Sequence, residues 1–464
     1  LQQRRKASGF AVSDAAVPSS VDGIVARIER LPTSWWQIKT RIIVGVATFF
    51  DAFDALAIAS VLPVIAPLWK LAPTQIGWLI SAGFVGQLIG ALLFGCIAER
   101  HGRMTAMVWS VALFSVMSLV CALAWDYPSL LVFRTIQGIG LGGEVPVAAV
   151  FISELARAQG RGRFVLLYEL VFPIGLVAAS LAGLWVVPHF GWPYMFVIGA
   201  LPGFLALVLR RLLPESPRWL AVRGRLAEAE AAMTLIEAET QKASGKPLPP
   251  PKPVVSTLDK PASLADLFGP LYLRRTLVVW VIWFCAYFVN YGLSIWLPTV
   301  YRTVFKMPLD QSLRYGLITQ AMGLIGTLIC ALAIDHVGRR LWFALSFAGA
   351  AAALAVLASH PTPTAEQVLA YMTVAYFFVS SINIGVYLYT PELYPTRVRA
   401  IGVGTATAWL RLASIIGPTV VGMMIASGLM AVFVTFAAAA GIAAVITGLF
   451  AVETKGRVLE EASP

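Results

Sequence analysis

The chain has 464 residues, 58% of them hydrophobic and only 13% charged, and its mean hydropathy is +0.78. Soluble domains carry about 25% charged residues, so this composition excludes an ordinary soluble protein and indicates one that crosses a membrane many times. The net charge of +11 could suggest nucleic-acid binding, but the positions of the basic residues explain it otherwise, as described below. The four cysteines lie in apolar runs without metal-ligand spacing and are interpreted as small core residues.

Residues 1–42 are the first expected unit, a polar cytoplasmic segment. The apolar core of a cleavable signal peptide is not visible in it. The stretch VDGIVARIERLP at 21–32 has the pattern of a short amphipathic helix, and we expect this helix to lie on the inner membrane surface.

Twelve apolar runs follow, each close to the roughly 20 residues that a spanning helix needs. They are expected at 43–67, 76–98, 105–124, 130–153, 164–187, 193–212, 276–300, 315–335, 341–359, 367–390, 401–425 and 429–451. The longest polar segment, between the sixth and seventh runs, has a helical pattern at 223–239 and an extended Pro- and Lys-rich stretch at 246–253. We therefore expect an all-α polytopic protein with bundles at 43–212 and 276–451, a cytoplasmic linker at 213–275 and a cytoplasmic tail at 452–464.

The basic residues predict the orientation of these helices, because Lys and Arg near the ends of spans stay in the cytoplasm. With both termini inside, 29 of the 35 Lys and Arg residues fall on inner segments, four on outer loops and two within spans. The basic balance is thus an orientation signal, and no nucleic-acid partner is expected.

Short charged loops repeat between the two sets of helices. ERHGR at 99–103 matches DHVGR at 335–339 with an offset of 236, and the acid and base of 153–163 match those of 391–400 with an offset of 238. Such a repeat indicates parallel halves with a ligand site near the midplane between them. We expect the charged residues of these loops to form a cytoplasmic gate that latches the halves together: Glu99, Arg103, Glu154, Arg161, Asp335, Arg339, Glu392 and Arg399. The alternative is that the Arg residues only anchor the topology.

The chain resembles the major facilitator superfamily in four loops: GCIAERHGRM (95–104), RTIQGIGLGGE (134–144), LPESPRWL (213–220) and PELYPTRVRA (391–400). It resembles more narrowly the bacterial niacin transporters, which are relatives of synaptic-vesicle glycoproteins and organic ion transporters, in FFDAFD (49–54), GIGLGGEVPVAAVFISE (138–154) and GWPYMFVIGALPGFLALVLR (191–210). The resemblance implies twelve helices in two pseudo-symmetric halves, alternating access and a bacterial inner membrane. VETKG at 452–456 departs from the sugar porters, which usually have Pro before the Glu.

Two acidic residues lie in the first apolar run, where an ionised carboxylate at the bilayer centre costs about 2.5–3.5 kcal/mol. Asp51 and Asp54 are three residues apart and so share a helix face. Two like charges this close do not both ionise easily in a low dielectric. We therefore expect one of them, Asp54 before Asp51, to carry a coupling proton. The alternative for Asp51 is an ion pair with Lys39 or Arg41.

Three further charged residues lie at membrane depth in the first half. Arg134 and Glu144 are ten residues apart, about 15 Å of helix, and cannot pair directly. Arg134 resembles a superfamily position that carries a structural or coupling charge, and we favour the structural role. Glu144 is a second candidate proton site, whereas for Glu169 a proton role and a structural role are equally open.

Arg411 is the most informative charge in the second half. Organic cation transporters that resemble TATAWLRLASIIGP (405–418) tend to have Asp at the matching position, and anion transporters tend to have Arg. A guanidinium remains charged in a dry site and can bind a carboxylate through two parallel donors. We expect Arg411 to hold the carboxylate of the substrate, with a purely structural partnership as the alternative.

Aromatic and amide side chains recur at helical spacing in two apolar runs of the second half. Such a face offers stacking partners for a flat ring and amides for a ring nitrogen or a carboxylate. We expect contacts to the substrate from Trp283, Tyr287, Asn290, Tyr376, Asn383 and Tyr387. Packing alone is the alternative, because aromatic stripes often have only that role.

These observations predict a proton-coupled symporter for a small aromatic carboxylate such as nicotinate. The alternatives are an organic cation transporter, a sugar transporter or a non-transporting sensor. An enzyme is not expected, because spaced His/Cys metal sets, nucleophile–base motifs and Walker-type loops are missing from the sequence. The expected partners are the substrate, protons and the lipid bilayer, with no cofactor or metal, and we expect a monomer.

Overall fold

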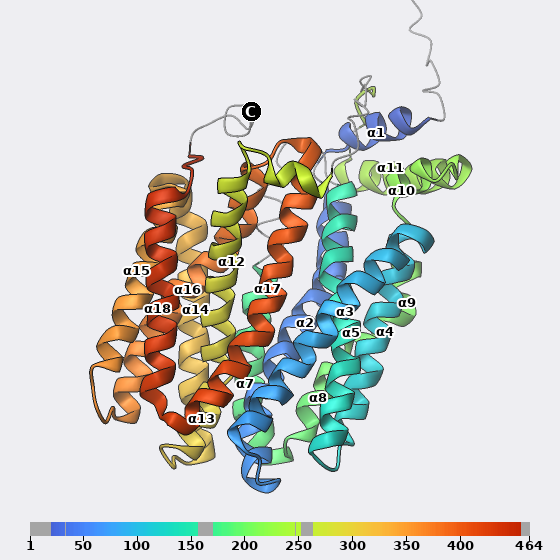
Figure 1. Cartoon of the computed structure of the whole chain (residues 1–464). Helices are drawn as coiled ribbons and strands as arrows, with labels where there is room; N and C mark the ends of the chain where they lie inside the picture. Colours follow the sequence, from blue (N-terminus) through green and yellow to red (C-terminus); the bar gives the residue numbers. More distant parts are fainter. Residues whose placement is uncertain (1–19, 33, 156–169, 246, 252–262, 456–464) are drawn as a thin grey trace, which may run out of the picture.

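The computed structural model describes residues 20–32, 34–155, 170–245, 247–251 and 263–455. Within these residues the chain is helical and has no strand. Twelve helical segments are long and apolar enough to cross a membrane, as expected for an all-α polytopic fold (Figure 1).

The first six spanning segments are α2 (Trp35–Leu68), α3 (Pro73–His101), α4 (Arg103–Ala122), α5 (Tyr127–Leu155), α7 (Val171–Phe190), and α8 (Pro193–Gly199) with α9 (Pro202–Leu212). The last six are α12 (Leu273–Ser294) with α13 (Leu297–Thr303), α14 (Leu309–Val337), α15 (Arg339–Ala358), α16 (Ala365–Glu392), α17 (Thr396–Met424) with η2 (Ile425–Ser427), and α18 (Leu429–Phe450). Part of the predicted fifth span, 164–169, lies outside the described residues.

Two spanning segments are divided into shorter helices. Pro202 lies at the start of α9 and Pro298 at the start of α13, where a proline is tolerated because the first turn of a helix needs no backbone donor. The Trp296 indole, between α12 and α13, donates a hydrogen bond of 3.1 Å to the carbonyl of Pro418. This bond joins the junction of α12 and α13 to α17.

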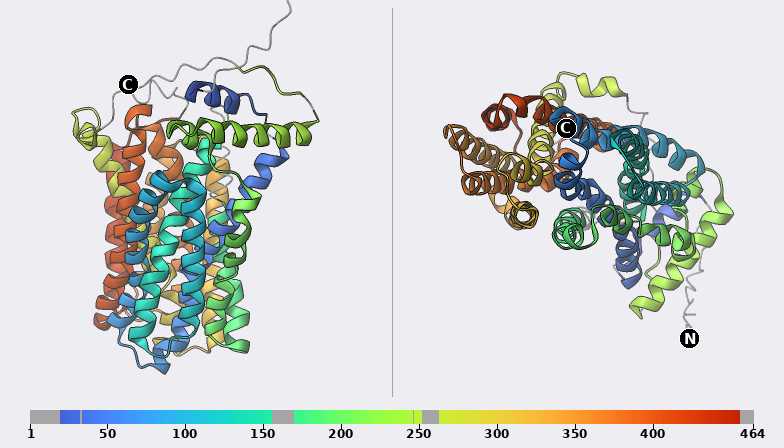
Figure 2. Two further views of the ribbon diagram at one scale, coloured as in Figure 1. Left: turned by 90° about the vertical axis from the view of Figure 1, so that its right-hand side faces the viewer. Right: turned by 90° about the horizontal axis from the view of Figure 1, so that it is seen from below.

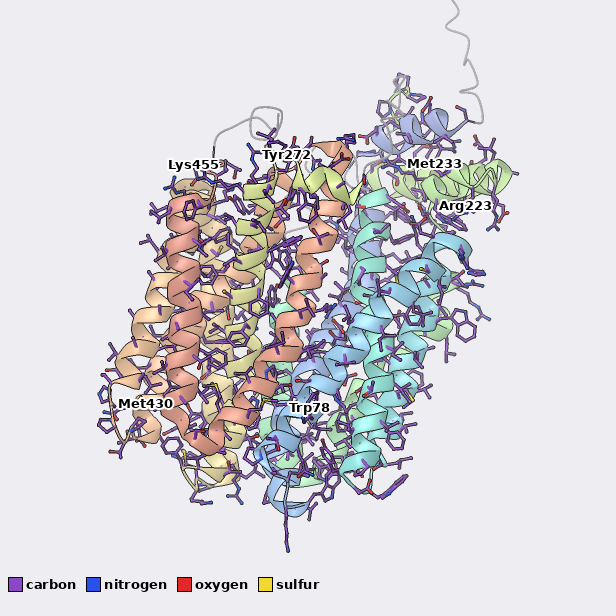
Figure 3. All side chains as sticks on the ribbon, viewed as in Figure 1. Trp78, Arg223, Met233, Tyr272, Met430 and Lys455 are labelled. Carbon is purple, nitrogen blue, oxygen red and sulfur yellow. The ribbon has the colours of Figure 1, made fainter. Side chains whose placement is uncertain are left out.

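The remaining helices gather at one end of the bundle, which we call the linker side. They are α1 (Val21–Glu29), α10 (Pro217–Val222), α11 (Leu226–Ser244) and η1 (Leu264–Phe268). This end is at the top of Figure 1, and Figure 2 shows α1 and α11 lying across the ends of the spanning helices. In Figure 3 the labelled Met233 and Lys455 lie on this side, and Trp78 and Met430 lie on the opposite side.

The apolar face of α1 packs on protein, which corrects the expectation that this helix lies on the membrane surface. Ile24 and Ile28 are each only 1% exposed and share a core with residues of α10 and α11. On the polar face, Arg27 and Arg30 bind the Glu237 carboxylate of α11, at 2.8 and 2.7 Å. The pattern of an amphipathic helix predicts that its apolar face is covered but not by what. Here the linker helices cover it.

The two halves are in contact along α3 and α17, which run antiparallel. Near the side opposite the linker, Cβ atoms added at Gly77 and Gly422 would lie 2.9 Å from the Pro418 carbonyl oxygen and 2.6 Å from that of Pro73. Toward the linker side, Gly95 of α3 and Gly404 of α17 border open space. The halves thus converge away from the linker side, as Figure 1 also shows.

A candidate substrate cavity between the two halves

A central cavity of about 920 Å³, a volume that includes its open mouth, lies between the halves. Side chains of α2, α3, α5 and α7 from the first half and of α12, α14, α16 and α17 from the second line it. Its wall contains six of the seven residues expected to contact substrate: Tyr287, Asn290, Tyr376, Asn383, Tyr387 and Arg411.

Arg411 is half-buried in the wall of this cavity and crosses to the other half. Its Nη1 donates a hydrogen bond to Oε1 of Gln87 on α3. A guanidinium has five N–H donors, and Gln87 occupies one of them on Nη1, where a carboxylate bound through Nη1 and Nη2 would compete with it. Gln87, which is buried and lines the same cavity, was not identified from the sequence, since a lone Gln in an apolar run has no distinctive pattern.

Asp51 also lines the cavity, and the positive charge of Arg411 acts on its carboxylate. Within the described part of the chain, Asp51 forms no ion pair, and its buried Oδ1 has no hydrogen-bond partner. The alternative of a pair with Lys39 or Arg41 is therefore not what the structure has. Arg41 is ten residues away along α2, about 15 Å.

Asp54 lies one turn further along α2 but outside the cavity wall, and it is completely buried. Its Oδ2 accepts a hydrogen bond of 2.9 Å from Gln137, and its Oδ1 accepts one of 3.4 Å from Ser118. Arg134 donates to Gln137 at 2.8 Å and to the backbone carbonyl of Asp54 at 3.5 Å. Gln137 thus links the carboxylate and the guanidinium, an amide bridge that sequence spacing alone could not reveal.

Glu144 lies in the interior of α5 and is fully buried. Thr48 of α2 donates a hydrogen bond of 3.0 Å to its carboxylate. Thr48 and Val145 line the cavity, so Glu144 lies directly behind the wall. Glu169 lies outside the described residues.

The aromatic residues of the second half form one stack along the cavity. Tyr287 stacks on Trp283 at 5.7 Å between ring centroids and on Tyr291 at 5.8 Å. Tyr387 meets Trp283 edge to face at 4.8 Å. Trp283 itself is fully buried behind the wall, and its indole donates to Thr390 at 2.8 Å. The structure therefore places Trp283 as a support for Tyr287 and Tyr387 and not as a lining residue.

Two amide oxygens beside the cavity lack partners among the described residues. The buried Oδ1 atoms of Asn290 and Asn383 accept no hydrogen bond there. Leaving a buried polar group unsatisfied costs about 1–3 kcal/mol. A group that donates a hydrogen bond to these oxygens would remove this cost.

The charged loops form two matching clusters on the linker side. Arg103 pairs with Glu99 at 2.9 Å and with Glu154 at 3.0 Å. In the second half, Arg339 pairs with Asp335 at 2.8 Å and with Glu392 at 2.9 Å. These six residues of the expected gate thus pair within each half in this conformation, and none of these ion pairs joins the two halves.

Each cluster contains one more acid that sequence analysis missed. Glu215 Oε1 accepts a hydrogen bond of 2.9 Å from the backbone N–H of Arg103, and Glu453 Oε1 accepts one of 3.0 Å from that of Arg339. The two acids stand 238 residues apart, the same offset as Glu154 and Glu392. That offset is the signal that could have identified them.

Arg399 and Arg161 are the remaining two residues of the expected gate. Arg399 Nε donates to the backbone carbonyls of Pro391 and Tyr394, at 3.0 and 3.2 Å. Arg161 lies outside the described residues.

The family model described as "Sugar (and other) transporter" matches residues 42–464. The chain belongs to this transporter family of the major facilitator superfamily. It is 35% identical to the niacin transporter NiaP of Acinetobacter baylyi, over 94% of this chain and 99% of that protein. It is 29% identical to the synaptic vesicle 2-related protein of Xenopus laevis, over 94% of this chain and 82% of that protein. The partially occluded inward-open xylose transporter XylE of Escherichia coli matches with a TM-score of 0.72 and 20% identity over 92% of this chain and 100% of that one, a likeness of fold alone. The chain is thus an integral membrane transporter and not an enzyme.

Proposed function

We propose that this chain is a proton-coupled transporter that takes up a small aromatic carboxylate such as nicotinate by alternating access. One observation carries the proposal: a guanidinium, Arg411, shares a cavity with an aromatic stack and with the amides of Asn290 and Asn383. The 35% identity to a niacin transporter over nearly the whole chain supports it. In this proposal both termini are cytoplasmic, the membrane is the bacterial inner membrane, and the protein is a monomer.

The carboxylate of the substrate would bind Arg411 through parallel N–H donors, a geometry that favours Arg over Lys. Its ring would lie against Tyr287 and Tyr387, where a good aromatic pair contributes about 0.5–1.5 kcal/mol beyond its buried area. Asn290 and Asn383 would donate hydrogen bonds from their Nδ2 N–H groups to the ring nitrogen or the second carboxylate oxygen. Trp283 would act by keeping the two tyrosine rings in place.

Proton coupling would use the Asp pair. An anion that enters against an inside-negative potential of 100 mV needs about 2.3 kcal/mol, and at least one accompanying proton removes this opposition. An ionised carboxylate is costly to bury without a directly bound cation. Among the described residues, the carboxylate of Asp54 has only Gln137 and Ser118 as direct partners, so we place the proton there first. Asp51, which faces the cavity, is the second candidate and Glu144 the third.

The charged clusters on the linker side would form the cytoplasmic gate. Each cluster ties the ends of spanning helices within its half, so that the half moves as one body. Closing the linker side would then bring two preformed charged surfaces together.

The experiment is uptake of labelled nicotinate into proteoliposomes with an imposed pH gradient. Arg411→Ala should reduce nicotinate binding by about 10- to 100-fold, the effect of losing hydrogen bonds to a charged group, and Arg411→Lys should restore only part of it. Asp54→Asn should abolish the response to the pH gradient but retain counterflow. Nicotinate uptake that ignores pH and survives both substitutions would refute the proposal.

An organic cation is a second candidate, because Asp51 presents a carboxylate to the same cavity. Arg411 opposes it, since a fixed positive charge in the wall repels a cationic ligand. Competition against labelled nicotinate separates the two: benzoate should inhibit, and a quaternary pyridinium of the same size should not.

A further inference from the structure

Gln87 is a direct partner of Arg411 in the cavity wall and belongs to the other half of the molecule. It lies on α3, is 3% exposed, and accepts a hydrogen bond from the Arg411 guanidinium on α17. Its backbone is fixed, because a Cβ at Gly142 of α5 would collide with the Gln87 carbonyl oxygen. Gln87 therefore moves with the first half, and Arg411 moves with the second.

The bond lies along the line where the two halves touch. Closer to the opposite side, Ser81 of α3 donates to the Ile415 carbonyl at 2.7 Å and contacts the Thr419 hydroxyl at 2.7 Å. Beyond Gln87, Gly95 and Gly404 border open space. Ser81 and Gln87 of α3 both bond to α17, and Gln87 lies nearer the linker side.

A neutral amide is a weaker partner for a guanidinium than a carboxylate is, because charge-assisted bidentate pairs are about twice as strong as neutral hydrogen bonds. We infer that Gln87 is bonded to Arg411 when no substrate is bound, and that the carboxylate of the substrate replaces Gln87 as the acceptor. This exchange releases a contact between α3 and α17, so that substrate binding acts on the junction of the two halves. The inference rests on the proposed function, since it needs a carboxylate ligand.

The exchange makes Gln87 a positioning residue that competes with the substrate. Gln87→Met, which keeps the volume and removes the acceptor, should tighten nicotinate binding about three- to tenfold. Gln87→Glu should weaken it at least tenfold, because the competitor becomes an ion-pair partner. A residue with a purely structural role would weaken binding in both variants. Equilibrium binding of labelled nicotinate to the purified full chain gives the two dissociation constants.

Ser81→Ala is the matched control, because it removes the other polar contact between α3 and α17 without touching Arg411. It should change the dissociation constant by less than about twofold. Equal tightening in Ser81→Ala and Gln87→Met would overturn the inference, because looser halves would then explain both. Unchanged or weaker binding in Gln87→Met would overturn it as well.

Thermal unfolding of the empty protein tests the bond without any ligand. The effect of Gln87→Met on Tm should vanish in the Arg411→Met background, because the two residues act through one contact. An equal shift in both backgrounds would overturn the inference. If the wild-type chain does not bind nicotinate, the proposed function is refuted instead. The comparison of Tm values in the two backgrounds still tests whether Gln87 is bonded to Arg411.

Discussion

Glu215 and Glu453 have the same role in the two halves. Each carboxylate lies against the glycine that ends one spanning helix and accepts hydrogen bonds from the first backbone N–H groups of the next helix. The donors are Arg103 and Met104 for Glu215, and Arg339 and Arg340 for Glu453. The N-terminus of a helix carries a partial positive charge and unpaired donors, which makes it a favourable place for a carboxylate.

Replacing either acid should therefore destabilise its own half. We expect Glu215→Ala and Glu453→Ala each to lower the free energy of unfolding by about 1–3 kcal/mol, because buried donors lose their acceptor. Glu228→Ala is the control, since its pair with Arg225 is exposed and exposed pairs contribute about 0–1 kcal/mol. Thermal unfolding in detergent measures all three. Losses no larger than that of the control would contradict this role.

Gly102 should not tolerate a side chain. Its φ of +107° lies in a region that disfavours other residues, and a Cβ there would collide with the Glu215 carboxylate. We expect Gly102→Ala to cost at least about 1–2 kcal/mol of stability. Gly441→Ala in α18 is the control, because nothing lies within 4 Å of its added Cβ and Ala is the better helix former. A Tm that falls equally in both variants would show that the turn does not need glycine.

The attachment of α1 should depend on pH through Glu237. Burial acts to raise the pKa of Glu237, but hydrogen bonds and charges from Arg27 and Arg30 outweigh it and lower the pKa below its ordinary value. A lowered folded-state pKa means that this stabilisation is complete above the ordinary pKa of about 4.3 and is lost as the pH falls through the lowered value. The protection of the backbone amides of residues 20–31, taken relative to their intrinsic exchange rate at each pH, should thus stay high and constant from pH 5 to 8.

Glu237→Gln should reproduce the acid effect at pH 7 and speed exchange in α1. Glu239→Gln is the matched control, because Glu239 is exposed on the same helix. Protection of α1 that is unchanged in Glu237→Gln would mean that the apolar contacts of Ile24 and Ile28 hold this helix without the ion pairs.

Trp283 and Tyr387 should respond differently to substitution because only Tyr387 lines the cavity. Tyr387→Leu should weaken nicotinate binding about 2- to 12-fold, the effect of one lost aromatic pair. Trp283→Phe should lower stability by about 1 kcal/mol through the lost hydrogen bond to Thr390 and change binding less. Binding constants and Tm values of the two variants test this, and a larger binding loss in Trp283→Phe would place its ring in direct contact with the ligand.

Patterns in the sequence predict the class of fold and several residues of the cavity wall. Runs of about 20 apolar residues predict spanning helices because lipid leaves a backbone no other way to pair its polar groups. The fold class and the family are confirmed. Arg411 could be singled out because a charge in such a run is rare and needs a reason.

Which side chains meet across helices depends on tertiary packing and could not be predicted. Asp51 and Asp54 share a helix face, yet Asp51 faces the cavity and Asp54 faces Gln137, because α5 packs against that part of α2. Gln87 and Gln137 are inconspicuous in the sequence and become direct partners of Arg411 and Asp54 through helix packing. Helical periodicity specifies the direction of a side chain relative to its own axis, whereas its partner depends on how neighbouring helices are rotated and shifted, which only the packed bundle determines.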